Sequence, residues 1–529
     1  MNLYATVLAL IILTLLVVAL TRLGKVKTKA DYLVAGRSLP AFVLVFTLLS
    51  SWIGSGSLLA AAENGYRHGF AALWTAAGGW AGLALIYFVA PRARRFAQFT
   101  IPDLLEARYN QTARVLGVIA ILFTYTAITS YQFIGGGDIL HLIFPSAVSA
   151  IHGRYIIAAF VILLTAIAGM SSVAYTDLAI GLLATITLCI ALPVLVHSVG
   201  GWSAVHAALP SSHFKVFGDI HPVNSYFGPN ILPDGTHERI SSALELFLPT
   251  CLLMLGNQSM YQKFFSAKSE KDATRAVTGW IVGTVVLETV IVALAVVGSA
   301  MFPSGEVHDH PREILAYVGL HAFQPAQTVT AVHNPGGPDI VITTTQVQPA
   351  FALHLLQLLG ALMMGAIFAK IISTANNYLF SPATNLVSDI FVRYLRPNAG
   401  NRQVLFVSRL MVVLLGVWAL IQSLGTESVL KKSLYAYTIY SAALTPVILA
   451  AFYWRRATAS AAVASIFTGT FVTVFWDSAF VHTHVPSSIA ERDAIFPALL
   501  ASLLCLVVVS LATPRPSEAH LRAFAPEPE

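Results

Sequence analysis

The chain has 529 residues, of which 56% are hydrophobic and only 11% are charged, and its formal net charge is +6 at pH 7. Soluble domains carry about 25% charged residues, so this composition excludes the soluble classes and indicates a polytopic membrane protein. The 3 cysteines all lie inside apolar segments, which argues against a disulfide framework or a cysteine-based metal site.

Thirteen apolar segments are long enough to cross a bilayer. They fall near residues 3–23, 41–64, 69–90, 115–143, 155–170, 174–198, 241–262, 276–302, 350–384, 404–424, 433–453, 459–478 and 494–512. Basic residues follow the first segment rather than precede it, so we interpret it as a transmembrane helix and not as a cleaved signal peptide. An odd number of spans predicts that the two termini lie on opposite sides of the membrane.

The distribution of basic residues predicts the orientation. Most of the 31 Lys and Arg residues lie in alternate connections, from the one after the first segment to the tail at 513–529. Because cytoplasmic connections are enriched in Lys and Arg, we expect a multi-pass protein of the cell membrane with its N-terminus outside and its C-terminus in the cytoplasm. The long connections 199–240 and 303–349 would then be extracellular. Topology accounts for the net positive charge, and we expect no nucleic-acid partner.

The second segment has a polar centre, SSWIGSGS at residues 50–57. Gly54 and Gly56 weaken a helix at about bilayer mid-depth and would free backbone carbonyl and amide groups there. Such groups are tolerated at that depth only where they line a cavity or are buried in protein. Many secondary transporters build their ion and substrate site around a helix broken in this way. Alternatively, the small residues only allow neighbouring helices to pack closely.

The ninth segment, ALMMGAIFAKIISTANNYLF (361–380), has a polar face. Helical spacing places Lys370, Ser373, Thr374 and Asn377 on that face. Two hydroxyl groups with amide and carbonyl oxygens suit a hard monovalent cation. The alternative is that the hydroxyl groups donate to carbonyls of their own helix. The other charged residues within spans usually face the interior of a bundle. They are Asp177, Glu245, Glu288 and Arg409.

Six motifs, in this order, resemble those of the sodium:solute symporter family. They are DYLVAGRSLP, SSWIGSGSLLAAAENGYRHGFAALW, AYTDLAIGL, GNQSMYQKFFSAKSEKDA, ISTANN followed by SDIF, and TPVILAAFYWRRAT. The resemblance covers nearly the whole chain, and it implies one all-α transporter domain with the LeuT-type fold.

That fold has two inverted five-helix repeats, each opened by a broken helix. The resemblance places the repeats at about 41–198 and 241–453, with the broken helices at 41–64 and 241–262. It places a leading helix with its cytoplasmic loop at 1–40, two further helices at 454–512 and a tail at 513–529.

The resemblance also implies a sodium site between the first broken helix and the ninth segment. Its ligands would be the carbonyls of Ser50, Ile53 and Lys370 and the hydroxyls of Ser373 and Thr374. Asp177, Asn376 and Asn377 fall where a second ion or a coupling group would lie.

Lys370 departs from the family pattern, which usually has a small residue at this position. Its carbonyl alone suffices for sodium, whereas its ammonium group would compete with a cation if it reached the cavity and paired with Asp177. The alternative is that the side chain extends toward the extracellular side or packs against another helix, satisfied by Glu245 or Glu288.

The substrate site would lie between the two broken helices. Its expected wall consists of Trp52, Ser55, Gly56, Glu63, Trp74, Gln132, Thr250, Leu253, Met254 and Tyr437. The SSWIGSGS motif most resembles the choline-transporter branch, in which an aromatic at the position of Trp52 lies near the substrate. Trp52 would then hold a quaternary ammonium group by a cation–π contact, or it is a packing residue. The apolar stretch LPTCLLML (248–255) argues against a hexose.

These observations predict a secondary transporter that imports a small polar organic solute with a cation, most simply sodium. One alternative is proton-coupled or ion-independent transport with Lys370 in place of the ion. A second is a transporter-like membrane sensor. We expect no enzymatic activity, no cofactor and no metal beyond Na⁺, since the loop histidines lack the short spacing of metal ligands. The expected partners are the solute and the lipid bilayer.

Overall fold

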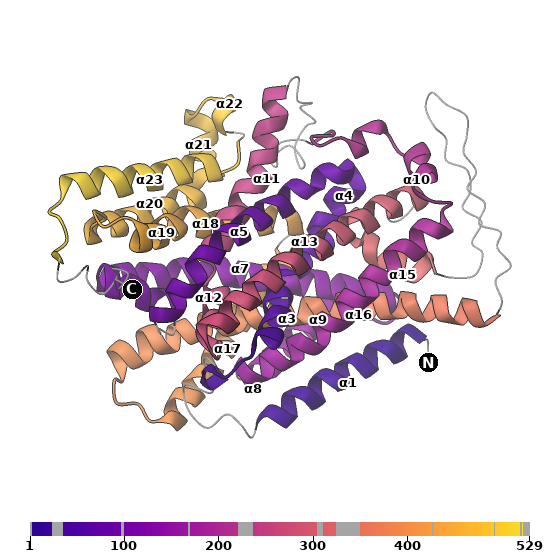
Figure 1. The fold of residues 1–529 in the computed structure, drawn as a ribbon, viewed down its shortest axis with the longest axis horizontal. Helices are drawn as coiled ribbons and strands as arrows, with labels where there is room; N and C mark the ends of the chain where they lie inside the picture. The colour runs from indigo at the N-terminus through magenta and orange to yellow at the C-terminus, as the bar shows by residue number, and fades with distance from the viewer. Residues whose placement is uncertain are drawn as a thin grey trace.

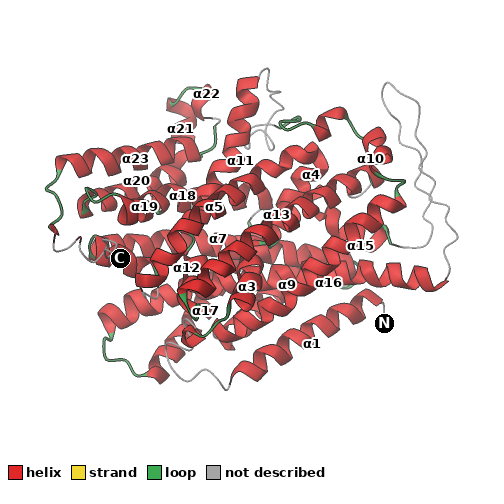
Figure 2. Ribbon diagram, in the orientation of Figure 1, coloured by secondary structure: helices red, strands yellow, loops and turns green. Residues whose placement is uncertain are grey.

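The computed structural model describes residues 3–23, 35–96, 100–167, 170–220, 236–303, 310–323, 350–425, 428–490, 492–518 and 521. Within these ranges the regular elements are all helices (Figure 2). Several sequence predictions fall on residues outside the described ones, namely the loop 24–34, the parts 221–235 and 324–349 of the long connections, and the tail from 522 onward.

Each of the thirteen predicted segments contains a helix. The helices are α1 (Leu3–Leu23), α3 (Ala41–Trp52), α5 (Leu73–Phe96), α7 (Gln111–Ile143), α8 (Ala150–Ile167), α9 (Met170–Ser198), α11 (Thr236–Gly256), α13 (Glu270–Met301), α16 (Ala350–Asn385), α17 (Asn401–Leu424), α18 (Val429–Ala443), α20 (Ala459–Trp476) and α23 (Ile495–Ala512). In the described chain, 11 helices are long and apolar enough to cross a membrane, and Leu3–Val18 and Ala41–Trp52 are shorter apolar stretches. The predicted all-α polytopic architecture is therefore confirmed.

The helices form one bundle, with the first helix at one edge and the last two helices at the other (Figure 1). Figure 1 shows α1 along one edge, beginning at the opposite end of the bundle from the point where α23 finishes. α1 packs against α16 and α9, whereas α20 and α23 pack on each other and against α18 at the other edge. Leu10, Leu20 and Leu511 are each more than half exposed on these edge helices, as expected for side chains that face lipid. Asp177, Glu245, Glu288 and Lys370 are buried inside the bundle. Arg409 on α17 is exposed instead, so the expectation that it faces the interior is wrong.

The second predicted segment is interrupted near its middle. α3 ends at Trp52, Ile53 has an extended backbone, and the helix resumes as a π-helical turn, η2 (Gly56–Ala61), followed by α4 (Ala62–His68). A Cβ atom at Gly54 would lie 2.6 Å from Oγ1 of Thr374 on α16. Gly54 therefore interrupts the helix and also lets α3 and α16 approach closely. The interrupted helix and the close helix packing, which were offered as alternatives for residues 50–57, both occur.

The seventh segment is also interrupted, as predicted. α11 ends at Gly256, and α12 (Gln258–Ser266) begins after Asn257. The Asn257 side-chain oxygen accepts hydrogen bonds from the Ser259 amide at 3.0 Å and from the Tyr125 hydroxyl at 2.7 Å. The Tyr440 hydroxyl donates to the Gly256 carbonyl at 2.7 Å. These contacts satisfy backbone groups that a continuous helix would have paired.

A short backbone bridge joins the two interrupted helices at one end. The Leu39 amide donates to the Ser266 carbonyl at 3.1 Å, and the Lys268 amide donates to the Leu39 carbonyl at 3.0 Å. Leu39 lies just before α3 and Ser266 ends α12, so the bridge ties the start of the first interrupted helix to the finish of the second.

Some parts of the predicted connections are helical. The α-helices among them are α6 (Ile101–Arg108), α10 (Trp202–Ala208), α15 (Ile314–His321), α21 (Ala479–His484) and α22 (Ser487–Ala490). α15 has the apolar sequence ILAYVGLH and packs against α16 and α13. It lies in the connection 303–349, which was expected to be extracellular, and its 8 residues are too few to span a bilayer.

Candidate functional site

The backbone groups freed at Ile53 and Gly54 are satisfied by side chains from two other helices. The Thr374 hydroxyl on α16 donates to the Ser50 carbonyl at 2.8 Å and to the Ile53 carbonyl at 3.2 Å. The Ser55 amide donates to Oε1 of Gln132 on α7 at 2.8 Å. Two carbonyl oxygens and one hydroxyl oxygen thus converge on one point at the interruption. Such hard oxygen donors suit a monovalent cation, which would bind with the hydroxyl proton turned away.

Asp177 on α9 lies next to this point and is completely buried. Its carboxylate accepts hydrogen bonds from Thr47 at 2.5 Å, Ser373 at 2.5 Å and the Asn377 side chain at 3.0 Å. The structure therefore brings Asp177 and Asn377 together with the hydroxyl face of α16. Asn376 does not join them, because its side-chain oxygen accepts a hydrogen bond from Thr165 on α8. Adjacent residues on a helix point in different directions, so Asn377 contacts Asp177 and Asn376 contacts α8. The role of Asn376 at a second ion site stays a prediction.

Lys370 points toward the interruption. Its ammonium group donates to the Ser50 hydroxyl at 3.1 Å, and that hydroxyl donates to the Asp177 carbonyl at 3.0 Å. Lys370 is completely buried. The ammonium group thus lies at the interruption of the first broken helix. Glu288 is not its partner, because the Glu288 carboxylate is bound by Trp52, Trp80 and Ser57.

A second buried lysine was missed. Lys263 directly follows the seventh predicted segment, 241–262, and so fell in a predicted connection, but it lies on α12 and is completely buried. Its ammonium group donates to the hydroxyl of Ser51, to that of Ser259 at 3.2 Å and to the Asn377 side-chain oxygen at 2.7 Å. Asn377 therefore links Lys263 to Asp177. The aromatic residues that follow it, Phe264 and Phe265, were the available signal that the helix continues into the protein.

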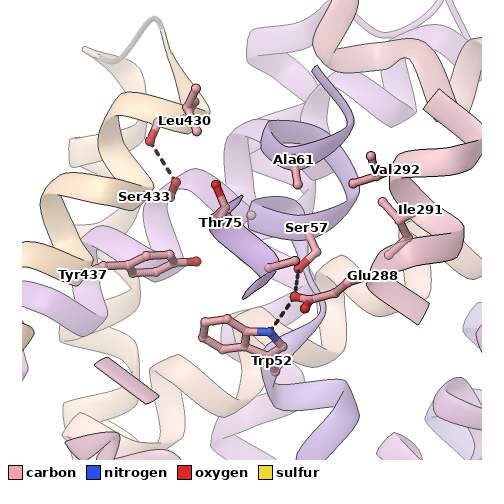
Figure 3. Close-up of a pocket in the computed structure, with 12 residues that line it drawn as sticks. Trp52, Ser57, Ala61, Thr75, Glu288, Ile291, Val292, Leu430, Ser433 and Tyr437 are labelled. Carbon is pink, nitrogen blue, oxygen red and sulfur yellow. Dashed lines mark hydrogen bonds between the residues drawn. The ribbon is translucent and has the colours of Figure 1, made fainter. Parts of the chain in front are cut away.

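A pocket lies on the other side of the first interruption, between η2, α5, α13 and α18 (Figure 3). Three predicted substrate residues, Trp52, Gly56 and Tyr437, line it. Trp52 and Tyr437 stack with their ring centroids 6.0 Å apart and their planes at 28°. The remaining lining residues were not predicted; they are Ser57, Ala61, Thr75, Ala76, Glu288, Ile291, Val292, Leu430 and Ser433.

The other predicted substrate residues do not line this pocket. Trp74 donates from its indole to the Val216 carbonyl at 2.9 Å and stacks on Phe217, in the connection after α10. Glu63 pairs with Arg67 one turn away on α4. Trp74 and Glu63 therefore make their contacts outside this pocket, and their role in substrate binding stays a prediction. The rest pack within the bundle; they are Ser55, Gln132, Thr250, Leu253 and Met254.

Gly54 offers a direct test of the close approach at the interruption. Gly54→Ala should lower the melting temperature and weaken the stabilisation expected from bound sodium, because its Cβ would lie 2.6 Å from Thr374 Oγ1 and overpacking costs about 1–3 kcal/mol. The measurement is the thermal unfolding of purified protein with and without sodium. Gly400→Ala is the matched control, since nothing lies within 4 Å of a Cβ there. A Gly54→Ala protein with the parent's melting temperature and sodium response would show that the approach is unimportant.

Comparison with known proteins relates this arrangement to transporters. The chain is 25% identical over 509 residues to the osmoregulated proline transporter OpuE of Bacillus subtilis (strain 168), covering 93% of this chain and 92% of the relative. It is 24% identical to the high-affinity proline transporter PutP of the same organism, with 93% and 95% covered. It is 23% identical to a sodium/proline symporter of Staphylococcus aureus (strain bovine RF122 / ET3-1), with 92% and 88% covered. These relatives give no support to the predicted choline-transporter branch.

Solved structures with similar folds are also transporters. The structure of a Na⁺-coupled sialic acid symporter in a substrate-bound outward-open state has a TM-score of 0.72 at 15% identity, with 98% of this chain and 99% of that chain covered. The nucleobase-cation-symport-1 family transporter Mhp1 in a closed conformation has a TM-score of 0.53 at 11% identity, with 93% and 97% covered. These likenesses concern the fold and confirm the LeuT-type architecture. The model of the sodium:solute symporter family matches residues 32–469, and the chain therefore belongs to that family of multi-pass membrane transporters and is not an enzyme.

Proposed function

We propose that this protein couples the entry of sodium to the import of a small polar organic solute by alternating access. The observation that carries the proposal is the convergence of the Ser50 and Ile53 carbonyls on the Thr374 hydroxyl, with Ser373 and Asp177 beside them. The Lys370 carbonyl would complete the sodium site. The names of the proline-transporter relatives make L-proline the first solute to test.

The same proposal includes the place and orientation of the protein. The protein would lie in the plasma membrane, with its N-terminus outside and its C-terminus in the cytoplasm, as the basic connections indicate. The two interrupted helices, α3 with α4 and α11 with α12, would open the inverted repeats at about 41–198 and 241–453. Asp177 and Asn377 would link the sodium site to the second interrupted helix through Lys263.

The hydrogen bond from Lys370 to Ser50 favours a second candidate. In this candidate the ammonium group takes the place of the ion, and transport is proton-coupled or independent of ions. The two candidates share the fold and the solute pocket, and they differ in which cation neutralises Asp177.

Uptake by purified protein in proteoliposomes tests the proposal. Uptake of radiolabelled L-proline should be concentrative under an inward sodium gradient, because an ion that binds with the solute drives it only while the ion gradient lasts. A sodium ionophore should abolish accumulation, and an inward potassium gradient should not replace sodium. Uptake at an equal rate with the gradient collapsed would contradict symport, and binding of the solute without any flux would indicate a sensor.

A further inference from the structure

Glu288 is the acidic group of the pocket. It projects from α13, is 5% exposed and lies between Trp52 and Ser57 (Figure 3). Its carboxylate accepts hydrogen bonds from the Trp52 indole at 2.7 Å, the Trp80 indole at 2.8 Å and the Ser57 hydroxyl at 3.4 Å. Three neutral donors thus hold the carboxylate in one orientation inside the bundle.

No basic side chain of the described residues forms an ion pair with Glu288. A buried acidic group at membrane depth is costly unless an opposite charge accompanies it. The three donors engage the two carboxylate oxygens and leave further lone pairs, since an ionised carboxylate has about four acceptor positions. The pocket therefore supplies a negative charge with acceptor capacity to spare and without a countercharge from the described chain.

The aromatic walls of the pocket favour the same kind of ligand. The Trp52 and Tyr437 rings stack beside the carboxylate, and the faces of aromatic rings attract positively charged nitrogen. A charged N–H group beside a carboxylate also forms the stronger class of hydrogen bond. Apolar side chains, namely Ala61, Ile291 and Val292, line the pocket as well, the last two on the same helix as Glu288. A ligand with one positive nitrogen and a small apolar body matches both groups of side chains.

We propose that Glu288 is a substrate-binding residue that selects solutes with a positively charged nitrogen, which binds between its carboxylate and the rings of Trp52 and Tyr437. This inference rests on the proposed function and assigns the class of solute, namely zwitterions and organic cations. The cavity volume in this conformation is about 20 Å³, little more than the 10–15 Å³ that one water needs. The pocket must therefore widen to admit the solute, which alternating access provides.

A purely structural role for Glu288 makes a different prediction. A neutral, protonated Glu288 would still join α13 to Trp52 and Trp80, but it would give the pocket no preference for positive charge. Comparing ligands that differ only in that charge separates the two roles.

The first experiment measures the binding of three probes to the purified full-length protein in sodium, by the shift in melting temperature. L-proline and glycine betaine carry a positive nitrogen, whereas cyclopentanecarboxylate has the ring and carboxylate of proline without the nitrogen. We expect at least one of the first two probes to stabilise the protein and cyclopentanecarboxylate to have no effect at the same concentration. Equal stabilisation by L-proline and cyclopentanecarboxylate would overturn the inference.

The second experiment uses Glu288→Gln, which keeps the size of the side chain and removes its charge. Its affinity for the stabilising probe should fall at least about 30-fold, because removing one partner of a buried charge pair is strongly unfavourable. Glu245→Gln is the matched control, since Glu245 is a completely buried glutamate on α11 outside the pocket, and it should bind as the parent does. If Glu288→Gln does not fold, Glu288→Asp keeps the charge and should keep the preference for L-proline over cyclopentanecarboxylate.

The outcomes separate this inference from the proposed function. Glu288→Gln could still take up a solute under a sodium gradient with the parent's half-saturation concentration. That result would refute the role of Glu288 and leave symport intact. The protein could instead prefer a positive nitrogen through Glu288 while its uptake is independent of the sodium gradient. That result would support the role of Glu288 and refute sodium coupling.

Discussion

Lys370→Ala should bind sodium up to about 1000-fold more tightly than the parent protein. The Lys370 ammonium group donates to the Ser50 hydroxyl at 3.1 Å. The carbonyl of the same Ser50 accepts a hydrogen bond from Thr374 and is a proposed sodium ligand. Two positive charges about 4 Å apart repel by about 4 kcal/mol at an effective dielectric constant of 20. Each 1.4 kcal/mol changes an equilibrium constant tenfold, and the neighbouring Asp177 offsets part of the repulsion.

The measurement is the sodium concentration that gives half-maximal uptake, determined at several pH values. The proton-linked candidate acts through the same ammonium group, so transport by Lys370→Ala should also vary less with pH than transport by the parent. Lys370→Arg keeps the positive charge and serves as the control, with a sodium response like the parent's. If Lys370→Ala has the parent's sodium and pH profiles, the lysine does not compete with the ion.

The double variant Ser373→Ala, Thr374→Ala should lose sodium coupling while it still folds. Thr374 contacts both carbonyls at the interruption, and Ser373 donates to Asp177. Hydrogen bonds within membrane proteins contribute about 0.6 kcal/mol on average, so the loss of stability should be small. Contacts to a charged group are worth about 1.5–3 kcal/mol each, so the loss of two ion ligands should weaken sodium binding at least about 100-fold.

Sodium-dependent uptake and sodium-dependent thermal stabilisation both report this loss. Ser381→Ala is the matched control, because Ser381 is a buried serine of the same helix whose hydroxyl has no hydrogen-bond partner among the described residues. It should leave sodium activation unchanged. Normal sodium activation in the double variant would mean that these hydroxyls only stabilise the helix pair and that the ion binds elsewhere.

The sequence was informative where a local pattern carries the physical signal. Gly54 in a polar stretch indicated an interrupted helix, and helical spacing indicated that Lys370, Ser373 and Thr374 share a face. Both features depend on residues a few positions apart, and both are present in the structure. The membrane spans were likewise predictable, because each is a continuous apolar segment long enough to cross a bilayer.

Contacts between distant segments were not predictable from local patterns. Glu288 is bound by Trp52 and Trp80, more than 200 positions earlier in the chain, so its direction depends on how α13 packs against α3 and α5. Lys263 was misassigned because a basic residue near the end of a span resembles a residue of a connection. Trp74 was placed in the pocket because nothing local shows that the chain after α10 returns to cover it.

The backbone bridge between Leu39 and α12 has a mechanical consequence. Two hydrogen bonds join the residue before α3 to the end of α12, so a movement that keeps both bonds must carry α3 and α12 together. The far halves, α4 and α11, have no such tie in the described structure. When the protein opens at this end, either α3 and α12 move together or both hydrogen bonds of Leu39 break. Amide hydrogen exchange at Leu39 and Lys268 would therefore record which motion accompanies each transport step.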